Sequence, residues 1–285
     1  MTYIKYIYKL IYCFLAINII ACSESSDPEE VFINPYPEIF NTEVVKRLTE
    51  TYETENYIFY FREGDIIEYE RMEAYAQWAI NYLGITLPKK IEYFKFRDPD
   101  EIEEAIGIKI GGIAFSRKTA FATYWSWHNH ETYHVLNYIW KNSSNFPPSF
   151  FNEGIAAAHE FDPYNNDWEP RNTRYHNNPE QESYLTSIKR FKDEGKLYSI
   201  ADLLDDEFWW DAQLTQTLEE WITYPQAGIF VYYLIEQYGL DKLKLLLNTL
   251  NYQDNFETLN SDFASIIGVS IEQAEQDWLL WLDNQ

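Results

Sequence analysis

The chain has 285 residues, of which 46% are hydrophobic and 24% are charged, and this composition is typical of a globular protein with a substantial core. It excludes a chain that is disordered throughout. The 46 acidic and 22 basic residues give a net charge of −24, so the phosphate backbone of a nucleic acid would be repelled and no nucleic-acid partner is expected.

The first 21 residues have the pattern of an export signal. Lys5 and Lys9 flank an apolar stretch over residues 10–21, which is short for a membrane span but the right length for the core of a signal peptide. The stretch ends in Ile-Ile-Ala-Cys at Cys22, which resembles the lipobox of bacterial lipoproteins. This resemblance implies cleavage before Cys22 and lipidation of its thiol. The alternative is an ordinary secretory signal or short anchor that happens to contain Cys22.

Residues 22–42 are predicted to form a tether. The run from Ser23 to Glu30 is acidic and polar and contains a proline, as is typical of a solvated linker. We expect the lipid to attach the protein to a membrane of the cell envelope. A serine after Cys22 resembles the outer-membrane class of lipoproteins, and an acidic run resembles surface-export signals. Because Cys13 would leave with the signal, no disulfide is expected in the mature protein.

Residues 43–126 have a strand and helix pattern. The apolar runs at residues 57–61 and 91–96 predict strands, and a helical period between them ends at Gly84. Two more short strands are predicted on either side of a polar turn, at residues 113–115 and 120–125. We expect a mixed sheet with helices on one side.

From residue 127 onward the pattern predicts helices, at residues 127–141, 149–161, 180–193, 226–238, 241–250 and 270–283. In the last of these, Ser270 and Gln273 form a predicted capping box before an apolar stripe. Strands followed by helices predict an α+β fold with a β-rich lobe over residues 43–126 and a helical lobe over residues 127–285.

Three of the five histidines, His128, His130 and His134, fall within seven residues. The last two frame an HExxH sequence. Positions four apart on a helix differ by about 40° in azimuth and 6 Å in rise, so one metal ion can bridge both imidazoles. Glu131 lies about 100° round the helix from His130, beside the metal, where a general base would act on a metal-bound water.

A third ligand is needed, because HExxH alone is a modest signal. Asn137 and Trp140 stand where a metzincin would have glycine and histidine, which excludes that family. Glu153 follows His134 after 18 intervening residues, and the stretch 145–149 breaks the chain between two predicted helices. An antiparallel second helix could therefore return Glu153 to the metal.

HExxH, eighteen residues and then Asn-Glu-Gly resembles the gluzincin metallopeptidases, specifically the aminopeptidase N and peptidase MA-like superfamily. The resemblance covers most of residues 55–283 and implies a thermolysin-like fold with the metal site in the cleft between two lobes. It implies that one zinc ion per chain is bound by three ligands, namely His130, His134 and Glu153.

The same resemblance implies the other roles at the site. Glu131 would be the general base of peptide hydrolysis, and Glu160 would support the metal site from behind a ligand. Tyr224 lies in a segment, residues 222–228, that is similar to the one whose tyrosine stabilises the oxyanion in that superfamily. Plainer interpretations are a solvated acid for Glu131, a helix-surface charge for Glu160 and a packing role for Tyr224.

The sequence departs from the aminopeptidases at residues 112–116. Phe115 stands where those enzymes carry a glutamate that binds the free amine of the substrate, and an apolar ring cannot neutralise an ammonium group. We therefore expect endopeptidase activity on peptide or protein substrates, with the strand over residues 111–115 pairing an extended substrate.

A second hypothesis is a surface-anchored binding or scaffold lipoprotein that keeps the metallopeptidase shape without turnover. The intact ligand set, with Glu131 present, argues against it. His128 and His159 are expected to be structural or to lie at the edge of the site, and His176 to be exposed. The sequence makes no prediction of oligomeric state.

Overall fold

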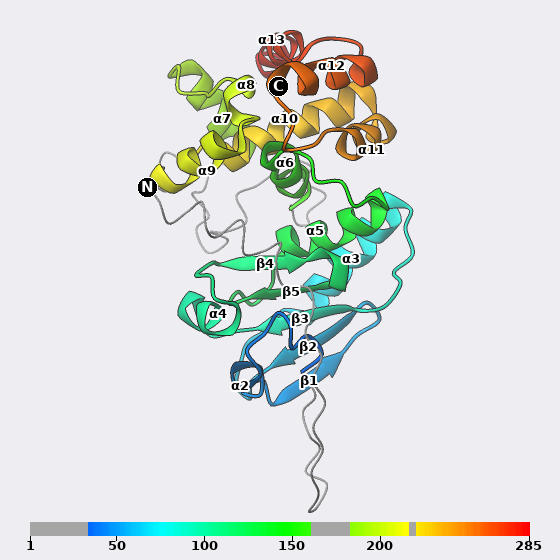
Figure 1. The fold of residues 1–285 in the computed structure, drawn as a ribbon, viewed down its shortest axis with the longest axis vertical. Helices are drawn as coiled ribbons and strands as arrows, with labels where there is room; N and C mark the ends of the chain where they lie inside the picture. The colour runs from blue at the N-terminus through cyan, green and yellow to red at the C-terminus, as the bar shows by residue number, and fades with distance from the viewer. Residues whose placement is uncertain (1–33, 161–182, 217–220) are drawn as a thin grey trace, which may run out of the picture.

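The computed structural model describes residues 34–160, 183–216 and 221–285 (Figure 1). The signal segment, Cys22, most of the tether and His176 lie outside these ranges. The described residues form 12 α-helices and one five-stranded mixed sheet, so the α+β class is confirmed. Within them, every helix is too short or too polar to cross a lipid bilayer.

The sheet has the strand order β1-β2-β3-β5-β4, which puts β4 (Gly112–Phe115) at one edge. β1 (Glu50–Glu53) is antiparallel to β2 (Tyr57–Phe61), and β4 is antiparallel to β5 (Ala120–Thr123). β3 (Ile91–Lys95) lies parallel to both β2 and β5. Figure 1 shows β4 as the strand nearest to the helical half of the molecule.

One face of the sheet packs against α3 (Tyr69–Leu83) and α5 (Asn129–Lys141). Tyr57, Phe59 and Tyr93 contribute to this first core. Gly84 ends α3 in the left-handed conformation, with φ 61°, as its position predicted.

The other face is also covered, so the expectation of helices on one side is wrong. Phe94 and Phe96 point into a second core with α2 (Thr42–Val45) and α4 (Pro99–Ile106). The reason is that β3 is buried on both faces, and alternate residues of a strand point to opposite sides.

The predicted boundary of the tether at residue 42 is also corrected. Residues 34–42 belong to the folded part, because Tyr36 and Phe40 are buried in the second core with Phe94. Their rings contact that of Phe94 at centroid distances of 6.1 and 4.6 Å. Burial of these aromatic side chains stabilises the start of the domain.

The second half of the chain is helical beyond α5, as predicted. Figure 1 shows these helices in the upper half of the view, above the sheet. The elements are α6 (Ser149–His159), α7 (Tyr184–Asp193), α8 (Ile200–Leu203), α9 (Asp206–Thr215), α10 (Thr223–Tyr238), α11 (Leu240–Thr249), α12 (Phe256–Ile267) and α13 (Ile271–Leu282). The sequence did not predict α8, α9 or α12. The Ser270 side chain accepts a hydrogen bond from the Gln273 backbone N–H at the start of α13, which confirms the predicted N-cap.

Close contact between α6 and α10 depends on two glycines. A Cβ added at Gly154 would lie 2.9 Å from the Ala227 carbonyl oxygen, and one at Gly228 would lie 3.0 Å from the Ala157 Cβ. Larger side chains would force the helices apart. This crossing brings the first turn of α10 close to Glu153, which precedes Gly154.

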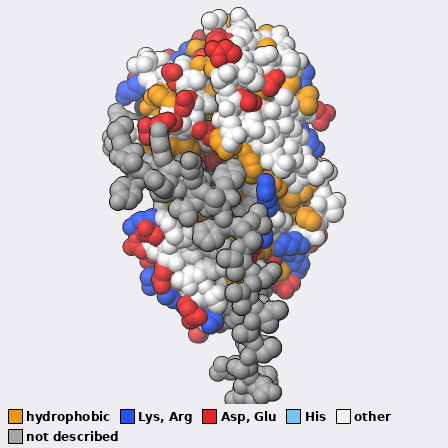
Figure 2. Space-filling model, viewed as in Figure 1, with side chains coloured by type: hydrophobic (Ala, Val, Ile, Leu, Met, Phe, Trp, Pro, Cys, Tyr) orange, Lys and Arg blue, Asp and Glu red, His pale blue; other side chains and the backbone are white. Residues whose placement is uncertain are grey.

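Acidic and basic side chains are interspersed over both halves of the face drawn in Figure 2.

Candidate metal centre

The start of α5 fixes the two candidate histidine ligands. His128 is the N-cap, and its Nδ1 accepts a hydrogen bond of 3.3 Å from the Glu131 backbone N–H. The Thr132 hydroxyl donates to the His128 carbonyl oxygen at 2.9 Å. His130 and His134 follow one turn apart and are both buried, so their rings project from one face of a helix whose start is held in place.

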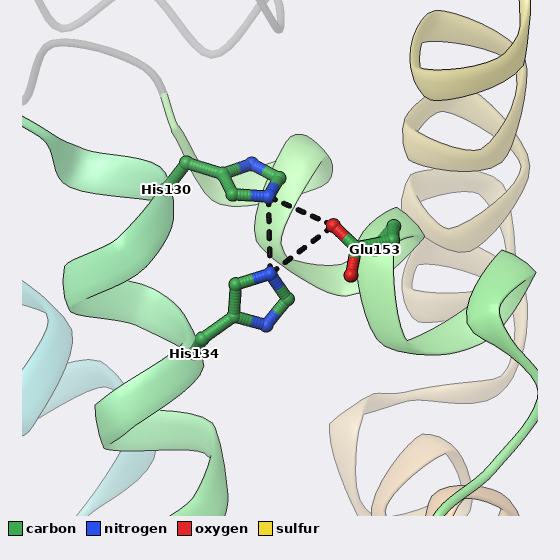
Figure 3. Close-up of side chains that lie close together, drawn as sticks. All are labelled: His130, His134 and Glu153. Carbon is green, nitrogen blue, oxygen red and sulfur yellow. Dashed lines mark hydrogen bonds and ion pairs between the residues drawn. The ribbon is translucent and has the colours of Figure 1, made fainter. Parts of the chain in front are cut away.

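Glu153 comes from α6 and meets the two imidazoles. Its Oε2 lies 3.1 Å from His130 Nε2 and 3.2 Å from His134 Nε2, and the two nitrogens are 3.0 Å apart. Figure 3 shows the three side chains converging from α5 and α6 on one point. The fold therefore brings together the three residues that the sequence predicted as ligands, His130, His134 and Glu153.

These three residues fit one metal ion. Bonds of 2.0–2.2 Å in a tetrahedral site separate neighbouring ligand atoms by about 3.3 Å. The observed separations of 3.0–3.2 Å are close to that value. Each of the three residues offers one ligand atom, which makes this group a candidate metal centre.

Charges at the centre favour an ionised carboxylate. Burial raises the pKa of Glu153, but the neighbouring His134 and His130 outweigh burial and lower it well below its usual range. Burial likewise lowers the pKa of His130, and hydrogen bonds to Glu153 and Glu160 raise it overall to about 10. The carboxylate is thus available as an anionic ligand over the whole physiological range of pH.

Glu160 lies directly behind His130. Its Oε2 is 2.7 Å from His130 Nδ1, and its Oε1 accepts a hydrogen bond of 2.6 Å from the Tyr184 hydroxyl. When a metal ion is bound, donation of the Nδ1 proton to Glu160 would leave the lone pair of Nε2 for the metal. Tyr184 was missed by sequence reasoning, because nothing in its surroundings distinguishes it among 24 tyrosines.

Glu131 lines the same cleft and faces β4. A Cβ added at Gly112 would lie 3.1 Å from Glu131 Oε1 and 3.0 Å from His128 Nε2, so a larger residue would require these side chains to shift by a few tenths of an ångström. The Glu131 side chain does not join the group of three ligand atoms. It lines the cleft together with His130, His134 and Glu153.

Tyr224 is the second residue of α10 and also lines the cleft. Its ring lies 5.6 Å from the His130 ring between centroids, and it packs against Trp209 and Trp221. The structure therefore brings it to the edge of the candidate metal centre, 94 positions along the chain from His130.

Phe115 does not lie where the sequence interpretation required. Its ring packs at 5.3 Å from Phe40 in the second core, on the opposite side of the sheet from α5. Alternation along β4 is the reason, because Gly112 and Ala114 face α5 while Ile113 and Phe115 face the other way. Phe115 therefore cannot determine how a substrate amine is treated.

The cleft that contains these residues has a volume of about 590 Å³, which is in the range of small-molecule and peptide sites. β4, α5, α6, α9 and α10 all contribute to its walls. Three of its apolar lining residues, Ile110, Phe146 and Leu214, are among the exposed large hydrophobic side chains of the described chain.

No protein-family model matches the chain, and no curated protein does. The assignment of the candidate metal centre thus depends on the residues and distances described above.

The two remaining described histidines differ in surroundings. His128 lines the cleft, whereas His159 is buried away from its lining and stacks on Tyr133 at 4.4 Å with the rings 5° from parallel. His159 Nδ1 is 2.8 Å from the Ile155 carbonyl oxygen. His128 thus lies at the edge of the site and His159 is structural, as expected.

Proposed function

We propose that this protein is a zinc-dependent peptidase of the gluzincin type. The observation that supports the proposal most is the convergence of two imidazole nitrogens and one carboxylate oxygen within 3.0–3.2 Å, with a second carboxylate, that of Glu131, beside them. Two histidines and one glutamate form a ligand set of catalytic zinc sites, which leave a further coordination position open.

The chain's own residues divide the hydrolysis between them. A zinc ion, when bound, supplies Lewis acidity that lowers the pKa of water to roughly 7 and polarises a carbonyl group. Glu131 accepts a proton from the attacking water and then delivers it to the leaving amine. The Tyr224 hydroxyl donates a hydrogen bond to the oxyanion that forms at the carbonyl carbon. Glu160 keeps His130 in the required tautomer and orientation.

An extended peptide can be bound by the edge strand of the sheet. Among the described strands β4 pairs only with β5, so the N–H and C=O groups on its other side have no strand partner there. Gly111 to Ala114 line the cleft beside Glu131. A substrate strand added to β4 would therefore place its backbone next to the general base.

We further propose that the enzyme is an endopeptidase. The two carboxylates among the described cleft-lining residues are Glu131 and Glu153, and both have roles in the hydrolysis. Neither carboxylate is therefore left to bind the free amine of a substrate, as an aminopeptidase requires. Peptides or proteins presented at the cell envelope are the substrates that fit this activity, and the lipid on Cys22 would hold the enzyme there.

The proposal is tested by zinc content and by turnover. One zinc ion per chain is expected by elemental analysis, and internally quenched blocked peptides are expected to be cleaved. A chelator should abolish cleavage and added zinc should restore it. Bound zinc without cleavage of any peptide would instead support the binding lipoprotein, and a chain that binds no zinc would overturn the proposal.

A further inference from the structure

The cleft continues from the candidate metal centre along α5. At one end Gly112 lies against Glu131, and at the other end Arg117, just beyond β4, donates a hydrogen bond of 2.9 Å to the Tyr138 hydroxyl. β4 and this part of α5 therefore run side by side in the same direction. Seven residues of a helix and three residues of a strand each span about 10 Å, so α5 and β4 line the cleft over the same length.

Lys141 lies at the far end of this cleft. It is the last residue of α5, seven positions after His134, which places it on the same helix face about 10 Å further along the axis. It lines the cleft and is only 4% exposed. Its neighbour Phe146 lines the same end.

The ammonium group of Lys141 is incompletely paired within the described chain. Its Nζ donates one hydrogen bond, of 2.9 Å, to the Asn145 carbonyl oxygen. An ammonium group has three donors, so two have no acceptor among the described residues. By contrast, the buried Lys95 donates to two carbonyl oxygens and does not line the cleft.

A buried positive charge is unfavourable unless it meets an anion. Among the described residues, no carboxylate pairs with Lys141, and burial alone lowers the pKa of this lysine to about 8. Lys109, the other lysine that lines the cleft, is exposed and already paired with Asp100. The far end of the cleft thus presents one buried cation, whereas its acidic groups, Glu131 and Glu153, are at the metal end.

We propose that Lys141 determines substrate specificity by binding a carboxylate of the substrate about three residues from the reacting bond. The distance follows from about 10 Å of helix and a rise of about 3.3 Å per residue of an extended chain. This inference rests on the proposed peptidase function.

Two sources of carboxylate fit this chemistry, and the direction of the substrate along β4 separates them. A substrate antiparallel to β4 brings a residue on the N-terminal side of the reacting bond to Lys141, which requires an acidic side chain. A substrate parallel to β4 brings the C-terminal side, where an acidic side chain or the C-terminal carboxylate can bind.

The test uses three matched pairs of quenched peptides built on a sequence that the zinc-loaded protein cleaves. Two pairs carry glutamate or glutamine three positions before or three positions after the reacting bond. The third pair ends three residues after the bond in a free carboxylate or a carboxamide. We expect one or more pairs to show at least a tenfold higher kcat/KM for the carboxylate, through a lower KM, and the responding pair identifies the source.

Variants assign the preference to Lys141. Lys141→Met should remove the preference, and Lys141→Gln, which keeps a donor for the Asn145 carbonyl, should do the same while preserving the fold. Lys109→Met is the matched control and should retain it, since Lys109 is exposed and paired. Equal kcat/KM within all three pairs, or a preference that persists in both Lys141 variants, would overturn the inference.

Binding separates this inference from the proposed function. The same peptide pairs are titrated against the full-length Glu131→Gln protein, and we expect a Kd at least tenfold lower for the carboxylate member. Failure of every peptide to be cleaved would overturn the proposed function. Equal Kd values within all pairs would overturn the role of Lys141, whatever the outcome for cleavage.

Discussion

The imidazole of His130 is held on both of its nitrogens. Nε2 faces Glu153 and Nδ1 faces Glu160, which is itself bonded to Tyr184. A hydrogen bond donated by a histidine ligand to a carboxylate behind it fixes the ring and raises its basicity. The packing of α7 places Tyr184 against Glu160, and Glu160 in turn affects how strongly His130 Nε2 can bind a metal.

Substitution Glu160→Gln is expected to lower zinc affinity by about 10- to 100-fold, because the negative charge behind His130 is lost while the shape is kept. Competition with a chromophoric chelator measures the change. Tyr184→Phe, which leaves the carboxylate in place, should have a smaller effect. Unchanged zinc affinity in a folded Glu160→Gln protein would contradict this role.

The buried His159 ring is expected to make the stability of the fold depend on pH. Burial lowers its pKa to about 4, against an ordinary value of 6.5. Well above pH 6.5 the ring is neutral in both folded and unfolded chains. As pH falls from 6.5 to about 4, the unfolded chain takes up a proton that the folded chain does not, so stability falls by on the order of 3 kcal/mol.

His159→Phe should keep the stacking on Tyr133 but remove this titration. We expect the free energy of unfolding, measured by urea denaturation between pH 7.5 and 4, to fall less steeply with pH in the variant than in the natural chain. Other titrating groups are common to both proteins, so the difference isolates His159. Identical pH dependence would show that the ring is not the source.

The spacing of His130, His134 and Glu153 along the sequence was enough to predict that these three candidate ligands lie together. A spacing of four on a helix and a helix-breaking stretch before Glu153 are local signals, and both appear in the structure. Tyr184 could not be predicted, because its contact with Glu160 depends on how α7 packs. Phe115 was misassigned because the sequence does not show which face of β4 an individual residue takes.

Among the secondary-structure elements, the approach of β4 to α5 determines where Glu131 lies. A Cβ at Gly112 would meet His128 and Glu131 at 3.0–3.1 Å, whereas one at Gly111 would meet only Trp125 and Tyr124 side-chain atoms, at an ordinary 3.6 Å. A side chain at Gly112 would thus crowd His128 and Glu131, whereas one at the adjacent Gly111 would not.

Gly112→Ala is therefore expected to displace the Glu131 carboxylate and to lower kcat, by up to about 100-fold for a displacement of about 1 Å. Zinc content should be unchanged, because the three ligands come from α5 and α6. Gly111→Ala is the control and should retain activity. Equal kcat values for the two variants would mean that close approach at Gly112 does not position the base.

Whether a helix or strand was predicted depended mainly on how clear its hydrophobic pattern is. α3, α5 and α13 have long apolar periods and clear ends. β1 has four exposed residues and is held by backbone pairing with β2, so no hydrophobic pattern marks it. α12 did carry a signal, an Asn255 N-cap followed by apolar residues at helical spacing.

Across the whole molecule, the candidate metal centre lies where the sheet meets the helical half. α5 supplies two of the candidate ligands and packs on the sheet, whereas α6 supplies the third and packs on α10. The α+β class was predictable from the order of strands and helices. The cover on both faces of the sheet was not predicted, although the unbroken apolar run at residues 91–96 is typical of a strand buried on both sides.

The central claim is that Glu131 moves the proton in a zinc-dependent hydrolysis. The measurement is the rate of peptide cleavage by zinc-loaded Glu131→Gln protein relative to the natural chain, with Glu103→Gln, an exposed glutamate of α4, as control. We predict full zinc content, a loss of about 10²- to 10⁴-fold in kcat for Glu131→Gln, and no loss for the control. Cleavage by Glu131→Gln at the rate of the natural chain would contradict the account.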